Sequence, residues 1–336
     1  MKVLSCKSPG EFEYLESKMP KLSEGRAIVK IKRIGICGTD LHAFEGTQPF
    51  FSYPRTLGHE LSGEVIEIGE SEEIFKGDDV TVIPYFNCGS CIACKKGKPN
   101  CCQNISVFGV HEDGGMQEYV SLPIPSLVKK EGLSLEQLAL AEPFAIGAHG
   151  VSRAGVKPGH VVLVVGAGPI GLGVLEFARI AGATVIAMDT NEKRLEFCQK
   201  EWNVEHVVKA GNNAFEAIRE ITKGDFCDSV IDATGSLTAI NQGFQYIAHG
   251  GNYVLVGLQK GEIAFSHPEF HKREATLMSS RNATREDFDQ VLDAMASGQF
   301  SVDKYITHRV RFDQVKNDFQ SWLNPETGVI KALVEL

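Results

Sequence analysis

Residues 161–171 read VVLVVGAGPIG, in which five apolar β-formers lead directly into a glycine-rich turn. An amphipathic stretch continues to Ala181, and a second apolar run follows at residues 184–188. A buried strand, a helix and a second buried strand in this order predict a βαβ unit with parallel strands. Further apolar runs at 229–232 and 253–256, separated by helical segments, extend this prediction to a doubly wound parallel sheet.

The glycine-rich turn predicts a dinucleotide site. Its glycines permit a tight turn and let backbone amides approach a pyrophosphate at the N-terminus of the following helix. Asp189 ends the second strand, where its carboxylate can accept the ribose hydroxyls of NAD and would repel the extra phosphate of NADP. The alternative is a turn that only packs helix on strand, with Asp189 capping the next helix. The order of elements favours NAD binding by Gly166, Gly168, Pro169, Ile170, Gly171 and Asp189.

Length and composition limit the remaining possibilities. The chain has 336 residues, more than one core usually holds, so two domains are expected. The net charge of −9 argues against a nucleic-acid partner, which would need clustered lysine and arginine. No apolar run has the length of a signal peptide or a membrane span, so we expect no membrane association and a cytoplasmic location.

The parts of the chain on either side of the βαβ series have a different pattern. Residues 1 to about 140 contain short β-type runs, such as 27–34 and 61–68, that are broken by glycine and proline. They predict a compact, mostly antiparallel domain with long loops. After about Arg281, a helical segment and a strand-like tail at 329–336 do not fit the βαβ series, and we expect them to return to this first domain.

Four cysteines lie in one short loop: Cys88, Cys91 and Cys94 at CxxC spacing, then Cys102 after seven further residues. Four thiolates suit one tetrahedral zinc ion, and a closed shell of four sulfurs leaves no position for substrate, so this site is structural. The adjacent Cys101 leaves the choice of the fourth ligand open. A redox dithiol or an iron–sulfur cluster also fits the motif, but no electron-transfer signature accompanies it.

A second group of potential metal ligands is scattered along the first domain: Cys37, His59, Glu60 and Glu142. Taken singly, Cys37 has an alternative interpretation as a small buried hydrophobic residue, His59 as a hydrogen-bonded loop histidine, and Glu142 as a carboxylate at the start of a helix. Spacing alone leaves these roles and a metal site equally open.

The segments GICGTDLH (35–42), LGHE (57–60), EPFAIGAH (142–149) and GAGPIG (166–171), with the four-cysteine loop, occur in the order found in zinc-containing medium-chain alcohol and polyol dehydrogenases. The chain resembles this family over essentially its whole length. The resemblance implies a GroES-like, mostly β catalytic domain and a Rossmann NAD-binding domain, with the active site in the cleft between them. The implied boundaries are 1–143 and 282–336 for the catalytic domain with its structural zinc lobe, and 144–281 for the Rossmann domain.

Within the family, the chain looks most similar to the sorbitol, threonine and galactitol phosphate dehydrogenases, which have glutamate, here Glu142, where other alcohol dehydrogenases use cysteine. The segments 48–55, 109–115 and 280–284 resemble the L-galactonate or L-gulonate 5-dehydrogenases more specifically. The resemblance implies oxidation of a secondary hydroxyl on a polyhydroxylated, sugar-derived small molecule. It also implies homodimers or homotetramers. The alternatives are a sorbitol, threonine, butanediol or sugar-phosphate dehydrogenase and, more remotely, a nonenzymatic sensor of NAD and zinc.

The resemblance implies two zinc ions (Zn2+) per subunit, one catalytic and one structural, with NAD as the second cofactor. Cys37 and His59 match the fixed ligands of the catalytic zinc. Glu60 and Glu142 match two carboxylates that bind or approach this metal, and which of them coordinates at rest is open.

Further roles are carried over from the same motifs. Thr39 matches the hydroxyl that accepts the substrate proton, His42 the imidazole that passes it outward, and Asp40 a residue that orients a ligand. A turn hydrogen bond and an exposed imidazole are the alternatives for Thr39 and His42. Arg194 is expected near the adenosine ribose, and Arg281 near the cofactor phosphate, unless either is a solvated surface charge.

An aldonate substrate needs a cation or hydrogen-bond donors for its carboxylate. The candidates are polar side chains in loops expected to face the cleft, namely Gln48, Arg55, His111, His271 and Lys272.

Overall fold

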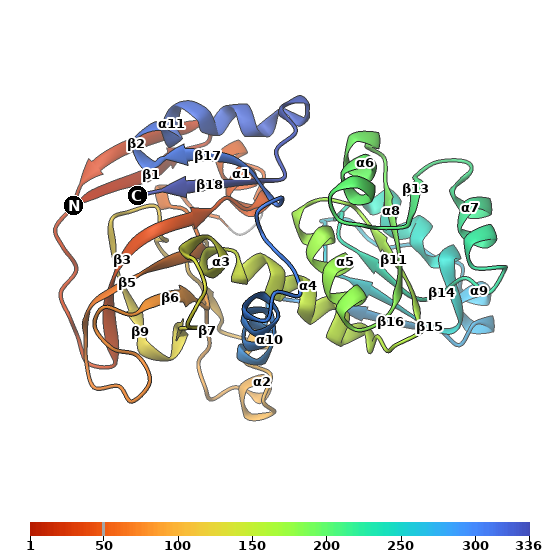
Figure 1. Cartoon of the computed structure of the whole chain (residues 1–336), viewed down its shortest axis with the longest axis horizontal. Coiled ribbons are helices and arrows are strands. Elements are labelled where there is room, and N and C mark those ends of the chain that lie inside the picture. The colour runs from red at the N-terminus through yellow and green to blue at the C-terminus, as the bar shows by residue number, and fades with distance from the viewer. Residues whose placement is uncertain (49–50) are drawn as a thin grey trace. The chain divides into compact units, whose positions relative to one another are not determined.

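The computed structural model describes residues 1–48 and 51–336, which form two compact units. Unit 1 comprises Met1–Glu142 and Thr284–Leu336, and unit 2 comprises Pro143–Ala283. The C-terminal segment therefore belongs to the same unit as the N-terminus. Figure 1 shows this as the blue strand β18 beside β3, from the N-terminal part of the chain, with the blue strand β17 next to β18.

A seven-stranded sheet organises unit 1, in the order β10-β6-β5-β3-β18-β17, with β9 paired to β3. Its strands are β3 (Arg26–Gly35), β5 (Glu60–Ile68), β6 (Asp79–Val82), β9 (Tyr119–Pro123), β10 (Leu127–Val128), β17 (Ile306–Arg311) and β18 (Lys331–Glu335). A three-stranded sheet contains β1 (Lys2–Ser8), β2 (Glu11–Glu16) and β4 (Arg55–Thr56), and a two-stranded sheet contains β7 (Tyr85–Phe86) and β8 (Ser106–Val107). The helices are α1 (Gly38–Glu45), α2 (Ile92–Lys95), α3 (Leu135–Ala139), α10 (Arg285–Ala296) and α11 (Val315–Asp318), while α4 (Ala141–Ala154) starts in this unit and continues into unit 2.

Three aromatic rings fix helix α1, which carries several predicted site residues, to the rest of unit 1. The Phe44 ring lies 5.0 Å from that of Phe12, on β2, and 5.1 Å from that of Phe319. All three side chains are buried in the main core of this unit. Burial of a phenylalanine contributes about 1.5–3 kcal/mol, so this cluster holds the helix against segments from both ends of the chain.

Unit 2 contains a six-stranded parallel sheet in the order β13-β12-β11-β14-β15-β16. Its strands are β11 (Val161–Val165), β12 (Thr184–Asp189), β13 (His206–Lys209), β14 (Cys227–Asp232), β15 (Ile247–Leu255) and β16 (Thr276–Ser279). Its other helices are α5 (Pro169–Ile180), α6 (Glu192–Lys200), α7 (Ala214–Ile221), α8 (Leu237–Gly243) and α9 (His267–Lys272). The predicted doubly wound parallel sheet is confirmed. Its order reverses between β11 and β14, where open sheets of this kind bind ligands at the carboxyl ends of their strands.

One element boundary in unit 2 differs from the sequence prediction. The pattern placed the start of the fourth apolar run at 253, whereas β15 already begins at Ile247, directly after a short 3-10 helix. The pairing with β14 jumps from Ile247 to Asn252, so the strand contains an irregular segment around Gly250 and Gly251. Glycines inside a strand mark such irregularities and hide the strand pattern.

Among the described residues, no helix combines the length and the apolar character needed to cross a membrane.

Candidate active site

Strand pairing in unit 1 brings Cys37 and His59 together. Gly35, the last residue of β3, lies opposite Glu60, the first residue of β5, in an antiparallel pair. Cys37 follows β3 and His59 precedes β5, so both lie at the same end of the ladder. A Cβ atom on Gly35 would lie only 2.0 Å from Glu60 Oε2, and only glycine therefore leaves room for this carboxylate.

Asp40 links the two loops that carry the thiol and the imidazole. Its carboxylate accepts hydrogen bonds from the backbone amides of Cys37, at 2.9 Å, and Gly58, at 3.2 Å. Its Oδ1 atom also lies 3.7 Å from His59 Nδ1. Burial raises the pKa of Asp40, and the neighbouring His59 opposes this shift. Asp40 thus contacts both loops, and its role in orienting metal ligands stays a prediction.

The side chains of Cys37, His59 and Glu60 have the donor set of a catalytic zinc site. One potential ligand atom from each lies within 4.8 Å of the others. His59 is buried, and within the described residues its Nδ1 atom has no hydrogen-bond partner. One sulfur, one nitrogen and one oxygen donor fit zinc, and three protein ligands leave a fourth position open.

Lys331 binds the carboxylate of this group. Its Nζ atom donates to Glu60 Oε1 and Oε2 at 2.6 and 2.7 Å, and to the carbonyl of Ile36 at 3.0 Å. Both side chains are fully buried, at 1% and 0% exposure. Burial lowers the pKa of Lys331, but Glu60 and Cys37 raise it, and the net shift is upward. Sequence reasoning missed this residue, although a lysine inside the apolar tail GVIKALVEL was a visible signal.

Glu142, the second residue of α4, has a different partner. Its Oε1 atom accepts the hydroxyl of Tyr85, from β7. Burial and the charge of Glu60 raise the pKa of Glu142 to about 7, against the opposing effect of His59. Glu142 is buried but does not belong to the group whose ligand atoms lie within 4.8 Å of one another. The structure therefore gathers Glu60, rather than Glu142, with the thiol and the imidazole.

Two tyrosines complete the polar surroundings of the site, and neither carried a recognisable signal in the sequence. Burial and the charge of Glu142 raise the pKa of Tyr85 well above its usual range. Tyr305 is fully buried, with its ring centroid 5.8 Å from Lys331 Nζ. Burial, followed by the charges of Glu60 and Cys37, raises the pKa of Tyr305 in the same way.

The proposed proton relay lies on α1. Thr39 is half-buried and His42 is exposed. His42 Nδ1 lies 3.3 Å from Thr47 Oγ1 and 3.4 Å from Glu45 Oε2. These are the contacts that the ordinary loop interpretation expects, so the relay stays a prediction.

The cysteine loop forms a second potential zinc site. The ligand atoms of Cys88, Cys91, Cys94 and Cys102 lie within 4.8 Å of one another, whereas the adjacent Cys101 is exposed and outside the group. Cys91 Sγ lies 3.5 Å from Cys94 Sγ and 3.9 Å from Cys102 Sγ. Hydrogen bonds from Ser90 lower the pKa of Cys88 to about 5. Four converging thiols fit one tetrahedral zinc ion.

In unit 2, the glycine turn has the shape of a dinucleotide cradle. Gly166 has a φ of +99°, and a Cβ atom on Gly171 would lie 1.7 Å from the Gly166 carbonyl oxygen. Gly168 is the N-cap residue of α5, and Pro169 and Ile170 open that helix. Backbone amides can therefore approach a pyrophosphate at its N-terminus, which fits NAD.

Asp189 lies beside this turn at the carboxyl end of β12. Its Oδ2 atom accepts the Ala167 amide at 2.7 Å, and Oδ1 accepts the Asn191 amide at 2.8 Å. Asn191, rather than Asp189, supplies the side-chain cap of α6. Arg194 Nη1 lies 3.8 Å from Asp189 Oδ2, so this arginine also faces the turn. Arg281 follows β16 and therefore lies, like Asp189, at the carboxyl ends of the parallel strands.

The residues predicted to bind a substrate carboxylate lie in different parts of the structure. His271 and Lys272, on α9, lie at the amino ends of the parallel strands, opposite the cofactor turn. Their position follows from the next residue, Arg273, which donates a hydrogen bond to the carbonyl of Ile247, the first residue of β15. They do not join the cofactor cradle. The resembling segment 48–55 includes Pro49 and Phe50, which lie outside the described residues.

Two further candidates have local partners within unit 1. Arg55 donates to Ser52 Oγ at 2.8 Å and lies 3.8 Å from Asp113 Oδ1. His111 Nδ1 accepts the Val107 amide at 2.9 Å, and Gln48 is half-buried.

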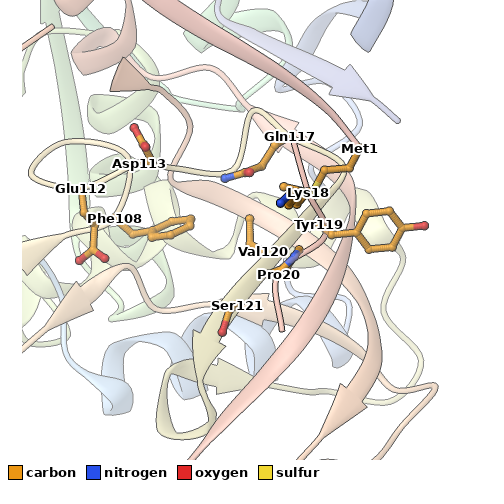
Figure 2. A pocket seen from close by; sticks show the side chains of 10 residues that line it. All are labelled: Met1, Lys18, Pro20, Phe108, Glu112, Asp113, Gln117, Tyr119, Val120 and Ser121. Atoms are coloured by element: carbon orange, nitrogen blue, oxygen red, sulfur yellow. The ribbon is translucent and has the colours of Figure 1, made fainter. Parts of the chain in front are cut away.

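A hollow on unit 1 is separate from these groups. Its volume is about 260 Å³. Figure 2 shows Met1, Lys18, Phe108, Asp113 and Gln117 among the residues that line it. None of the predicted metal ligands or cofactor residues lines it. It therefore has no part in the site.

Comparison with known proteins shows to which family the chain belongs. Residues 23–132 match the alcohol dehydrogenase GroES-like domain, and residues 169–297 match the zinc-binding dehydrogenase domain. The L-galactonate-5-dehydrogenase of Escherichia coli K12 is 44% identical over 99% of this chain and 98% of its own length. The chain belongs to the zinc-binding alcohol dehydrogenases. The predicted family and the predicted fold class, a GroES-like domain with a Rossmann sheet, are thus confirmed.

Solved structures of other dehydrogenases share the whole fold. A protein named rspB from Escherichia coli CFT073, complexed with NADH, has a TM-score of 0.93 and 29% identity, and the match covers 100% of this chain and 99% of that one. A zinc-binding dehydrogenase from Sinorhizobium meliloti 1021, bound to NADP, has a TM-score of 0.89 at the same identity and coverage. This dehydrogenase is therefore an oxidoreductase with zinc and a nicotinamide dinucleotide as cofactors, as predicted.

Proposed function

We propose that this dehydrogenase uses NAD to oxidise the C5 hydroxyl of an aldonate of the L-galactonate or L-gulonate type. The proposed reaction class rests on one observation: ligand atoms of Cys37, His59 and Glu60 lie within 4.8 Å of one another. The substrate class is supported by the 44% identity, over nearly the full length of both chains, to an L-galactonate-5-dehydrogenase.

The residues that would bind zinc and those that would bind NAD have separate tasks. Cys37, His59 and Glu60 would hold zinc, while NAD would lie over the Gly166–Gly171 turn. When bound, zinc acts as a Lewis acid for the substrate hydroxyl, and NAD accepts the hydride. Asp40 orients the thiol and the imidazole through its contacts with Cys37 and His59.

Proton removal is assigned to helix α1. Thr39 accepts the proton from the substrate hydroxyl and gives up its own hydroxyl proton in the same step, and His42, being exposed, takes up that proton and releases it to solvent. The imidazole suits this task because its ordinary pKa lies near neutral pH.

Asp189 supports the choice of NAD over NADP. Both of its carboxylate oxygens already accept backbone amides, so its position beside the turn is fixed. The 2′-phosphate of NADP would meet this carboxylate and be repelled.

The deciding experiment is a substrate panel. Initial rates of NADH formation are measured with L-galactonate, L-gulonate, galactitol, sorbitol, L-threonine and butanediol, on enzyme of known zinc content. A clear preference in kcat/KM for an aldonate supports the proposal. Preference for a neutral polyol or an amino acid would refute the substrate and leave the reaction class in place.

We also propose that the chain forms a homodimer or homotetramer through the edge of the unit 2 sheet. Among the described strands, β16 pairs only with β15, and Leu277 on this edge strand is 37% exposed. An exposed edge strand is a template for pairing with a second chain. Light scattering coupled to size-exclusion chromatography tests this, and a monomer at micromolar concentration would contradict it.

A cytoplasmic location completes the proposal. All nine cysteines are free in the structure, which suits a reducing compartment. Fractionation of the cells tests it.

A further inference from the structure

The two buried carboxylates of the candidate active site are held by different kinds of donor. Glu60 has both oxygens bound by the Lys331 ammonium, at 2.6 and 2.7 Å. Glu142 instead accepts one hydrogen bond from the neutral hydroxyl of Tyr85. The two glutamates are therefore not equivalent before any metal binds.

Position, rather than the kind of donor, distinguishes the carboxylate that is available to the metal. Glu60 lies with Cys37 and His59 in one group of ligand atoms, and Glu142 lies outside it. Zinc in a catalytic site takes three protein ligands and keeps a fourth position for substrate. A second carboxylate that was free to turn toward the ion could occupy this fourth position.

The backbone around Tyr85 is fixed independently of Glu142. Tyr85 lies opposite Val107, and Phe86 opposite Ser106, in the antiparallel pair of β7 and β8. The ring of Phe86 also lies 6.0 Å from that of Phe108. Cys88, the first ligand of the cysteine loop, follows two residues after this strand. The backbone that carries the Tyr85 phenol is thus held by its pairing with β8 and leads directly into the cysteine loop.

We propose that Tyr85 is a positioning residue whose hydroxyl holds Glu142 away from the catalytic metal and so keeps one coordination position open for the substrate hydroxyl. This role rests on the proposed function. A hydrogen bond to a carboxylate is stronger than one between neutral groups, and few alternative donors are available to a buried carboxylate. Without the hydroxyl, Glu142 turns toward the metal ion, and the open position closes.

The test compares Tyr85→Phe with the wild type in the full-length, zinc-loaded enzyme. Release of the catalytic zinc to a colorimetric chelator is followed over time. Glu142 acting as a fourth ligand should slow this release about 10-fold or more, and kcat should fall about 10- to 100-fold, the range for a lost hydrogen bond to a charged group. A purely structural role of Tyr85 would instead loosen the site and speed the release of zinc.

Two further variants separate the outcomes. In Tyr85→Phe/Glu142→Gln the neutral amide is a poor zinc ligand, so the rate of release should return to the wild-type value or above it. Tyr14→Phe removes a comparable tyrosine hydroxyl, which donates to the Phe312 carbonyl, and should leave zinc release unchanged. Release from Tyr85→Phe at the wild-type rate, or faster, would overturn the role.

Glu142→Gln alone gives a test that does not depend on the folding of the tyrosine variant. If Glu142 is held off the metal, this change should leave zinc release within about 2-fold of the wild type, because no zinc ligand is lost. A large acceleration would show that Glu142 coordinates at rest, and would overturn the proposal. Failure of the wild type to oxidise an aldonate would refute the substrate only, since the release rates are measured without substrate.

Discussion

Replacement of Lys331 by methionine should destabilise unit 1 strongly, because it leaves the Glu60 carboxylate buried without its cation. Glu60 is 0% exposed and binds Lys331 through both oxygens. Removing one partner of a buried ion pair costs about 3–5 kcal/mol. For a domain of this size each kcal/mol lowers Tm by roughly 2–4 °C, so the expected loss is roughly 6–20 °C.

Calorimetry of the metal-free and the zinc-loaded chain measures this effect. The loss should be larger without metal, because a bound zinc ion gives Glu60 a second cationic partner. Lys130→Met is the matched control, since it breaks an ion pair with Asp293 in which both side chains are exposed, and such pairs contribute about 0–1 kcal/mol. A loss for Lys331→Met no larger than that of the control would refute the importance of the buried pair.

Three further outcomes are expected. Asp189→Ser should raise kcat/KM for NADP relative to NAD by about 10-fold or more, because the repulsive carboxylate is lost; an unchanged ratio of the two values would count against the role of Asp189. Cys91→Ser should remove about one zinc ion per subunit and lower Tm while the catalytic zinc stays bound, as metal analysis and calorimetry would show; retention of both ions would contradict the four-cysteine site. His271→Ala and Lys272→Ala should leave KM for the aldonate within about 2-fold of the wild type, because both residues lie at the amino edge of the sheet; a large increase would reassign the carboxylate site.

Local patterns in the sequence were enough to predict the dinucleotide turn and the cysteine loop. Strand, turn and helix follow one another directly at residues 161–180, and the four cysteines lie between 88 and 102. Their geometry depends mainly on neighbouring residues, so spacing carries most of the information.

The contacts around the candidate active site depend on distant parts of the chain. Lys331 and Glu60 are 271 positions apart, and Tyr85 and Glu142 are 57 apart. Only the pairing of β18 and β5 with β3 brings the first pair together. Spacing cannot encode such a contact, although a lysine in an apolar strand implies that a buried partner exists. For the same reason the sequence left the choice between the two glutamates open.

The most direct test of the proposed function combines zinc analysis with the rate of NADH formation from L-galactonate and NAD, for the wild type and for Cys37→Ser. The wild type should contain two zinc ions per subunit and oxidise the aldonate. The variant should retain about one zinc ion and lose turnover, because the loss of a thiolate leaves too few ligands for the catalytic ion. Full activity of Cys37→Ser, or an unchanged zinc content, would contradict the assignment of this site.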